Sequence, residues 1–323
     1  MTHTKVPEIS FVVPVYNGAG SIGEVVRQII DAYPGMEIEV VLVNDGSADD
    51  SEAVCRKLVD QYPLQVSFVQ LMKNFGEHSA VLAGLSRTRG EFVAVLDDDG
   101  QNPPAEVRKL YDLCRSRELD VVYGFYEKKA HHWFRNLGSW LNDKAANIMV
   151  RKPPEIYLSS FKVMRRRLVD EIVRYKGPYP YIDGLIFRTT SRVGQTQVKH
   201  VQRQSGQSGY TLRKLVRLWL NMFVNHSMLP LRIASILGAV TAGLSALMIL
   251  AIFVEKLATP NYPIGIPSIL VSILFFAGVQ LIILGVVGEY LGRLFLDHNG
   301  VPQYVVRYQL GATTHDAASR GVT

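Results

Sequence analysis

Cysteine is scarce in this sequence. The 323 residues include two, Cys55 and Cys114, which are far apart and show no CxxC spacing. This scarcity excludes a disulfide-stabilised scaffold and a cysteine-rich zinc module. Both cysteines fall in predicted helices, so we expect them to be reduced residues in the core of a cytosolic domain.

Familiar ligand-binding and catalytic signatures are also missing. Neither GxxxxGK[ST] nor GxGxxG follows a predicted strand, which disfavours ATP and NAD as ligands. The sequence has no isolated Ser-His-Asp or Cys-His arrangement of the kind used in nucleophilic catalysis. His131 and His132 have no further His or Cys at ligand spacing, so we do not expect them to bind a metal.

Long apolar runs are absent from the N-terminus, so no cleavable signal peptide is expected. They occur instead near the C-terminus, where residues 233–254 and 264–288 carry no charge. Each run reaches the length of about 20 helical residues that a bilayer core requires. The short link 255–263 predicts a transmembrane hairpin; the alternative is a buried hairpin of a soluble protein.

Positive charge is concentrated around this hairpin, and the net charge of the chain is +6. Basic residues flank its outer ends, whereas the link contains only one. They are Arg213, Lys214, Arg217 and Arg232 before it, Arg293 and Arg307 after it, and Lys256 in the link. This bias places both termini in the cytoplasm and favours anionic lipid over nucleic acid as the partner.

Short β-rich runs alternate with helical patterns between residues 8 and 125. The predicted strands are Ile9–Val15, Ile38–Val43, Val66–Gln70, Phe92–Leu96 and Val121–Tyr123, and the predicted helices are Ser21–Ala32, Ser51–Gln61, Glu77–Ser86 and Pro104–Arg117. Strict alternation predicts an α/β fold with a mostly parallel sheet and helices on both faces. We expect this α/β fold to occupy a cytoplasmic domain over 1–209, followed by a juxtamembrane amphipathic helix over 210–230, the hairpin within 231–292 and a cytoplasmic tail over 293–323.

The fourth predicted strand runs directly into Asp97, Asp98 and Asp99. In open α/β sheets, ligands bind beyond the carboxyl ends of the strands. Asp97 and Asp99 alternate on an extended backbone and could share one hard cation, Mg²⁺ or Mn²⁺, whose remaining ligands are water and substrate phosphates. The alternative is a solvated acidic turn that caps the helix beginning near Pro104.

The loops after the first three strands are rich in Asn, Asp and Gly, which are also ordinary turn residues. Together with the acidic loop they would form one pocket, and a nucleotide-sugar suits it better than NAD or ATP. The candidate donor-binding residues here are Pro14, Tyr16, Asn17, Asp45, Lys73, Asn74, Gly76 and Asp98. Asp183 is another candidate active-site acid, or equally a helix cap.

Two later segments are candidates for contact with the membrane and with a phosphate group. Residues 132–150 have apolar residues, including two Trp, at helical spacing, which fits an interfacial helix or a helix packed in the core. The glycine-broken loop Arg203–Tyr210 precedes Arg213 and Lys214 and could wrap a phosphate, or could be an interdomain linker.

Four motifs resemble those of family 2 glycosyltransferases with the GT-A fold, and most closely their polyprenyl-phosphate branch. They are Val12–Asn17, Val43–Ser47, Asn74–Ala80 and Leu96–Pro104. The resemblance covers residues 8 to about 308 and includes the C-terminal hairpin. It implies that Asp45 contacts the base or ribose, that Asp97 and Asp99 form a D-x-D pair with Gln101 assisting at the metal, and that the loop with Ser208 closes over the donor.

Three positions depart from the family pattern. Gly18 stands where Glu is usual, Asn44 stands where Asp is usual, and Ser159–Lys162 replaces a Ser-Gly-Phe-Arg pattern. These departures leave the predicted metal site intact but affect donor recognition, so no sugar is assigned.

The resemblance implies an inverting transfer of a sugar to the phosphate of undecaprenyl phosphate at the bacterial inner membrane. The bacterial type of membrane hairpin favours a UDP-linked donor. The second pKa of a phosphate monoester, about 6, makes a general base unnecessary. The predicted ligands of the acceptor phosphate are Arg135, Ser139, Arg203, Arg213 and Lys214, with Arg135 and Arg203 counted among the catalytic residues. The product would serve cell-envelope glycan synthesis or lipopolysaccharide modification.

Two alternatives remain open at this point. A processive or other membrane glycosyltransferase would extend a glycan, but it usually carries a Q-x-x-R-W motif that Gln202–Gln204 does not match. A membrane-anchored nucleotide-sugar-binding protein would lack catalysis altogether. Gly238, Gly243, Gly278 and Gly285 would permit close helix contacts in a homo-oligomer.

Overall fold

The computed structural model describes residues 6–126, 155–199 and 265–311, together with isolated positions between 236 and 254. The chain divides into two compact units, one formed by residues 1–209 with 300–323 and the other by Tyr210–Asn299. The predicted interfacial helix 132–150, the juxtamembrane helix 210–230 and the tail beyond Gly311 lie outside the described residues.

In the described part of the first unit, eight strands form one sheet in the order β7-β5-β6-β4-β1-β2-β3-β8. The strands are β1 (Ile9–Val15), β2 (Ile38–Asn44), β3 (Val66–Leu71), β4 (Phe92–Val95), β5 (Val121–Phe125), β6 (Lys162–Arg165), β7 (Val193–Gln197) and β8 (Val306–Leu310). Strands β4, β1, β2 and β3 pair in parallel at the centre. Every residue of β2 and β3 is buried, as near-continuous Val, Ile and Leu runs predict for a sheet covered on both faces.

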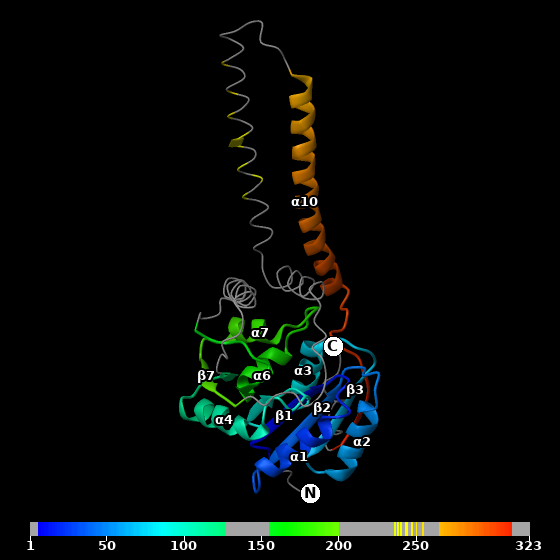
Figure 1. The fold of residues 1–323 in the computed structure, drawn as a ribbon, viewed down its shortest axis with the longest axis vertical. Coiled ribbons are helices and arrows are strands. Elements are labelled where there is room, and N and C mark those ends of the chain that lie inside the picture. The colour runs from blue at the N-terminus through cyan, green and yellow to red at the C-terminus, as the bar shows by residue number, and fades with distance from the viewer. Residues whose placement is uncertain are drawn as a thin grey trace. The chain divides into compact units, whose positions relative to one another are not determined.

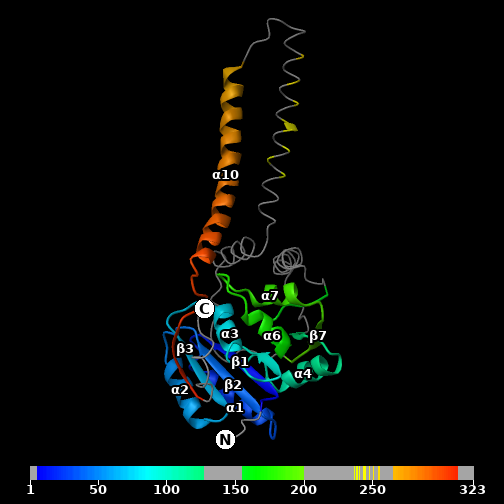
Figure 2. The same ribbon diagram turned by 180° about the vertical axis from the view of Figure 1, so that it is seen from behind.

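Helices cover both faces of this sheet (Figures 1 and 2). They are α1 (Ile22–Ala32), α2 (Ser51–Gln61), α3 (Glu77–Leu85), the 3₁₀ turn η1 (Pro104–Glu106), α4 (Val107–Ser116), α6 (Arg166–Val173) and α7 (Ile182–Thr189). Alternate residues of β1, such as Phe11 and Val13, pack with α1, α2 and α4, whereas Val12 packs with α3, α6 and α7. The two-residue period of the strand thus feeds two separate cores.

The sheet is mixed: in the described part of the chain four strand pairings are parallel, as the prediction of a mostly parallel sheet requires, and three are antiparallel. Strand β6 inserts antiparallel between β4 and β5, and β8 lies antiparallel against β3. β6 has four residues and carries Lys162 and Arg165 at its ends, so it lacks the apolar run from which strands are recognised. β8 comes from far along the chain, and tertiary pairing rather than local pattern selects it.

The edge strand β8 is fixed to the sheet by side chains as well as by backbone pairing. The ring of Tyr308 packs edge-on against Phe68 at a centroid distance of 6.0 Å, and its hydroxyl donates to Glu52 at 2.6 Å. Arg87 Nε donates to Gln309 Oε1 at 3.1 Å. Residues 306–310 therefore belong to the sheet domain although they follow the apolar C-terminal segment in the sequence.

In the second unit, the helix α10 (Ile266–His298) is 33 residues long. Among the described residues it is the one helix long and apolar enough to cross a membrane, over Phe275–Gly292. This helix covers most of the predicted span 264–288 and continues beyond it. The other predicted span, 233–254, is described only at isolated positions, so the two-helix hairpin remains a prediction.

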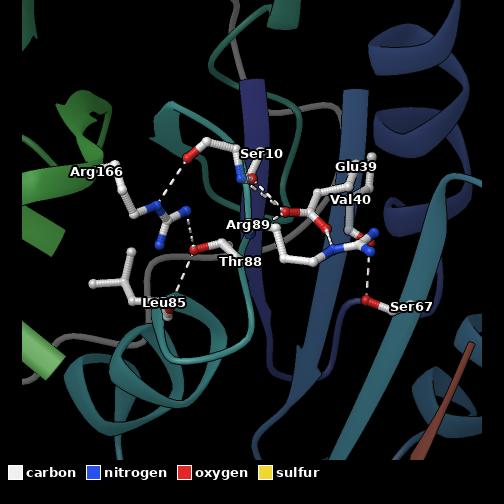
Figure 3. A network of polar contacts seen from close by, with 9 residues as sticks. Ser10, Glu39, Val40, Ser67, Leu85, Thr88, Arg89 and Arg166 are labelled. Atoms are coloured by element: carbon white, nitrogen blue, oxygen red, sulfur yellow. Dashed lines mark hydrogen bonds and ion pairs between the residues drawn. The ribbon is translucent and has the colours of Figure 1, made fainter. Parts of the chain in front are cut away.

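The carboxylate of Glu39 is buried at the end of the sheet where β1 and β2 begin (Figure 3). Glu39 Oε1 accepts hydrogen bonds from Ser10 Oγ at 2.5 Å, from Gly90 N at 3.2 Å and from the backbone N–H of Arg89. Glu39 Oε2 accepts from Arg89 Nε at 3.2 Å. Arg166 completes the network, because its Nε donates to the carbonyl oxygen of Gly90 at 2.9 Å.

Candidate active site

Four loops meet at the opposite end of the central strands. They follow β1, β2, β3 and β4, whose parallel pairing sends their carboxyl ends to one edge of the sheet. Pro14 pairs with Val43 within the sheet just before the first two loops begin. Side-chain hydrogen bonds join the loops and so fix their positions relative to one another at the candidate site.

The loops after β1 and β2 are bonded to each other. The backbone N–H of Asn17 donates to Ser47 Oγ at 2.9 Å, and Asn17 Oδ1 accepts from the N–H of Ala48 at 2.9 Å. Asn17 has a left-handed backbone with φ of +55°, which asparagine tolerates better than most residues. This reciprocal pair fixes the exposed turn that includes Tyr16, a predicted donor-binding residue.

Asp45 links the second loop to the third. Its carboxylate accepts the N–H of Phe75 at 2.7 Å through Oδ1 and the N–H of Gly76 at 2.9 Å through Oδ2. Burial raises the pKa of Asp45, while these two hydrogen bonds oppose the shift. Gly76 has φ of +93°, so a glycine suits this turn. Exposed Lys73 lies over the Phe75 ring at 5.2 Å.

Asn44, the second departure from the family pattern, has a matched partner. Its Nδ2 donates to Gln70 Oε1 at 2.8 Å, and its Oδ1 accepts from Ser47 Oγ at 2.5 Å. A carboxylate at position 44 would face the Gln70 oxygen without a proton to donate. The neutral amide is therefore the side chain that satisfies this buried pair.

Asp97 is half-buried, and its hydrogen bonds are made through one of its two carboxylate oxygens. Its Oδ2 accepts hydrogen bonds from Ser160 Oγ at 2.6 Å and from Asn102 Nδ2 at 3.0 Å. Within residues 6–126 and 155–199, both recorded hydrogen bonds of this carboxylate end on Oδ2 and come from neutral donors. Burial raises the pKa of Asp97 and the nearby Asp99 adds to this, while the Ser160 and Asn102 hydrogen bonds and the Lys162 cation lower it.

The other two acids of the loop have different neighbours. Asp98 Oδ2 accepts the N–H of Tyr16 at 3.0 Å, which joins the acidic loop to the loop after β1. Asp99 Oδ1 accepts the N–H of Gln101 at 3.0 Å within a tight turn, where Gly100 has φ of +72°. The turn keeps Asp99 and Gln101 adjacent, as the predicted metal site requires.

The described residues contain no group of three or more His, Cys, Asp or Glu side chains placed to enclose a metal ion. A cation that arrives with a nucleotide diphosphate needs only one or two carboxylates, since phosphates and water complete its shell. Asp97 fits that role, because the neutral donors reach one of its oxygens and burial has already raised its pKa.

A buried ion pair lies next to this loop. Lys162 pairs with Asp183, and Asp183 Oδ1 also accepts the hydroxyl of Tyr123 at 2.8 Å. Asp183 is thus the counterion of Lys162, which neither of the sequence-based interpretations anticipated. Burial raises the pKa of Glu77, and Asp97 and Asp183 act in the same direction while Lys162 opposes them.

His78 follows Glu77 on α3 and packs edge-on against Tyr181 at a ring-centroid distance of 5.0 Å. Burial lowers the pKa of His78 to about 4, so the imidazole is neutral near pH 7. It therefore supplies no positive charge to the site at that pH.

Other predicted site residues fall outside the described part of the chain. They are Arg135, Ser139, Arg203, Ser208, Arg213 and Lys214. Sequence reasoning overlooked the roles of Asn102 and Ser160 in holding Asp97. Both stood within motifs already singled out. Asn102 is five residues from Asp97 in the same loop, whereas the contact of Ser160 depends on the pairing of β4 with β6.

The model of glycosyl transferase family 2 matches residues 10–173, which contain all four loops and the acidic cluster. The chain belongs to this family. It is therefore a glycosyltransferase, as the resemblance predicted. The first unit carries the family match, and the helix α10 lies beyond it in the sequence.

Curated relatives of this family 2 member include two bacterial proteins named undecaprenyl-phosphate 4-deoxy-4-formamido-L-arabinose transferase. The protein of Sodalis glossinidius (strain morsitans) is 31% identical over 310 residues, covering 95% of each chain. The protein of Aeromonas hydrophila subsp. hydrophila is 30% identical over 322 residues, covering 97% of each chain. The similarity thus runs through the sheet domain and α10.

Among solved structures, the chain is similar to glucosyl-3-phosphoglycerate synthase from Mycobacterium tuberculosis in complex with Mn²⁺, UDP and glucosyl-3-phosphoglycerate. The TM-score is 0.51 at 17% identity, and the match covers 68% of this chain and 78% of that chain. At this identity the likeness establishes the fold. The α/β fold class predicted from the sequence is confirmed.

Proposed function

We propose that this glycosyltransferase transfers a sugar from a UDP-sugar to the phosphate of undecaprenyl phosphate, with inversion at the anomeric carbon. The observation that carries the proposal is the similarity, over 95% of the chain, to relatives named for transfer to undecaprenyl phosphate. The apolar helix α10 supports it, because an acceptor with a long isoprenoid tail resides in a membrane. The bacterial relatives favour the inner membrane as its location, with the sheet domain in the cytoplasm.

The acidic loop is proposed to bind the diphosphate of the donor together with Mg²⁺ or Mn²⁺. When bound, the cation would offset the negative charge of the departing nucleoside diphosphate. Asp97 and Asp99 would hold it, with Gln101 nearby. Ser160 and Asn102 keep Asp97 oriented by binding its Oδ2, which supports a role for Oδ1 as the ligand atom.

The loops after β1, β2 and β3 are proposed to bind the nucleoside. Tyr16 and Asn17 are exposed and held in place by hydrogen bonds to neighbouring loops, so they are preorganised for a ligand. Asp45 uses both oxygens to hold the N–H groups of Phe75 and Gly76. We therefore assign Asp45 a shaping role in addition to its predicted contact with the base or ribose.

The acceptor phosphate needs positive charge rather than a base. Its second pKa is about 6, so it is largely dianionic at neutral pH and is already a nucleophile. We propose that Arg135 and Arg203 hold it, assisted by Ser139, Arg213 and Lys214. We assign His78 no role as a base or as a cation, because its imidazole is neutral near pH 7.

A direct assay tests the proposal. The full chain in detergent is mixed with undecaprenyl phosphate, Mg²⁺ or Mn²⁺, and a panel of radiolabelled UDP- and GDP-sugars. We expect one UDP-sugar to give a lipid product that carries a single sugar, and EDTA to abolish its formation. A product with several sugars would favour a processive enzyme. Tight donor binding without any lipid product would contradict the proposal.

A further inference from the structure

The space where a side chain at position 18 would begin is occupied by Asp98. A Cβ atom built on Gly18 would lie 2.3 Å from Asp98 Oδ2 and 2.9 Å from Asp98 Cγ. Gly18 is not among the glycines with positive φ, so its backbone conformation is open to other residues. The neighbouring carboxylate, rather than the backbone, is therefore what a side chain at position 18 would have to displace.

That carboxylate binds the same loop. Asp98 Oδ2 accepts the N–H of Tyr16 at 3.0 Å, across 82 positions of sequence. The next three N–H groups of the loop donate to side chains that lie after β2: those of Asn17, Gly18 and Ala19 bind Ser47 Oγ, Ser51 Oγ and Asp49 Oδ2 respectively. Of these four successive bonds, the one to Asp98 comes from the acidic loop.

We propose that Asp98 is a positioning residue that holds the loop after β1, which would bind the nucleoside, against the acidic loop after β4, which would bind the diphosphate. Gly18 leaves the space that the Asp98 carboxylate occupies. A donor spans both loops, because its nucleoside lies at one and its diphosphate at the other. Fixing the distance between the two loops before the donor arrives reduces the conformational entropy that is lost on binding. This inference rests on the proposed function and deepens it, because it names a residue pair that sets donor affinity.

The test is a double-mutant cycle in the full chain with Gly18→Ala, Asp98→Ala and the double variant. Each single change removes the bond to Tyr16, so we expect the donor KM to rise about tenfold in each. The double variant should show the same tenfold rise, because both changes act through one bond. The acceptor KM should not change. Asp98→Asn retains an oxygen that accepts the Tyr16 N–H and should stay within about threefold of wild type.

Gly20 provides the matched control. It lies in the same loop and is exposed, and a Cβ there would meet nothing within 4 Å. Gly20→Ala should leave both KM values unchanged. Thermal melting of each variant separates a loss of folding from a loss of affinity. We expect Gly18→Ala to melt like wild type, because the added methyl displaces the end of a flexible side chain rather than backbone.

Hydrogen exchange of the peptide that covers residues 12–20 gives a readout independent of activity. Faster exchange at Tyr16 in both single variants, without further increase in the double variant, would support this role of Asp98. Additive effects of the two changes on donor KM, or unchanged exchange in Asp98→Ala, would overturn it. If the wild-type chain transfers no sugar at all, the proposed function fails, while the exchange result still decides whether Asp98 holds the loop.

Discussion

The central sheet has a carboxylate at each end of its strands, Glu39 at one end and Asp97 at the other, and the two ends differ in how that charge is neutralised. Where β1 and β2 begin, Glu39 is buried and accepts four hydrogen bonds, one from the Arg89 guanidinium. Where β4 ends, Asp97 accepts hydrogen bonds from the neutral groups of Ser160 and Asn102. The protein itself neutralises the first carboxylate, and a bound cation is proposed to neutralise the second.

This difference separates a structural carboxylate from a functional one. A carboxylate with a complete set of donors stabilises the fold and has little left to offer a ligand. A half-buried carboxylate whose pKa is raised by burial costs stability, and it gains from a divalent cation that reaches it. Changes at the two ends should therefore have opposite consequences for activity and for stability.

Asp97→Ala should give the largest effect on activity. Without this carboxylate the acidic loop loses a proposed metal ligand, and transfer to undecaprenyl phosphate should fall by roughly a thousandfold or more. Thermal melting should show the variant to be about as stable as wild type, because the hydrogen bonds to Asp97 in the described residues come from neutral groups and burial raises its pKa. Wild-type turnover in purified Asp97→Ala protein would refute the assignment.

Glu39→Ala should give the opposite result. The change leaves Ser10 Oγ and the N–H groups of Arg89 and Gly90 without this acceptor, and the unfolding free energy should fall by about 3 kcal/mol. Arg89 is 41% exposed, so water compensates for much of its lost ion pair. Denaturant titration measures the loss. The turnover of the protein that remains folded should match wild type, and a thousandfold loss at equal stability would contradict the comparison.

Ser160→Gly should have an intermediate effect. It restores the residue that the family pattern has at this position and removes one of the two donors to Asp97 Oδ2. We expect kcat/KM for the donor to fall about five- to tenfold, since Asp97 keeps only Asn102 to orient it. Ser159→Ala is the control, because the Ser159 hydroxyl accepts the Phe161 N–H and does not bind Asp97. Equal losses in both variants would assign the effect to the loop rather than to Asp97.

His78→Gln should have the smallest effect, visible only in acid. The folded-state pKa of about 4 lies below the ordinary value of 6.5 because burial disfavours the charged imidazole. The unfolded chain therefore binds a proton that the folded protein excludes, and wild-type stability falls as the pH decreases from about 6.5 towards 4. Melting temperatures of wild type and variant across this range should converge as the pH falls. Parallel curves would contradict a His78 that is neutral in the folded protein.

The sequence predicted much of the fold at the centre of the sheet. β1 and α2 have the predicted bounds, and the other predicted strands and helices up to residue 116 agree within a few residues. Apolar runs of strand length alternate there with amphipathic helices, so local pattern and tertiary position agree. The strands β6, β7 and β8 were not predicted, because they are short, contain polar or basic residues, and depend on pairing with distant strands.

The candidate site shows the same division. Motif order correctly grouped the loops after β1 to β4, since parallel strands send their carboxyl ends to one edge. The contact of Ser160 with Asp97 was beyond the sequence, because Ser160 lies 63 residues away and is brought near by the antiparallel strand β6. The ion pair of Lys162 with Asp183 was missed for the same reason.

The most direct measurement is calorimetric binding of UDP to the full chain in detergent, with and without Mn²⁺. We expect binding by wild type to require Mn²⁺, binding by Asp97→Ala to be lost, and binding by Glu39→Gln to stay at the wild-type level. UDP binding that is equal in wild type and Asp97→Ala, or that is indifferent to Mn²⁺, would contradict the account.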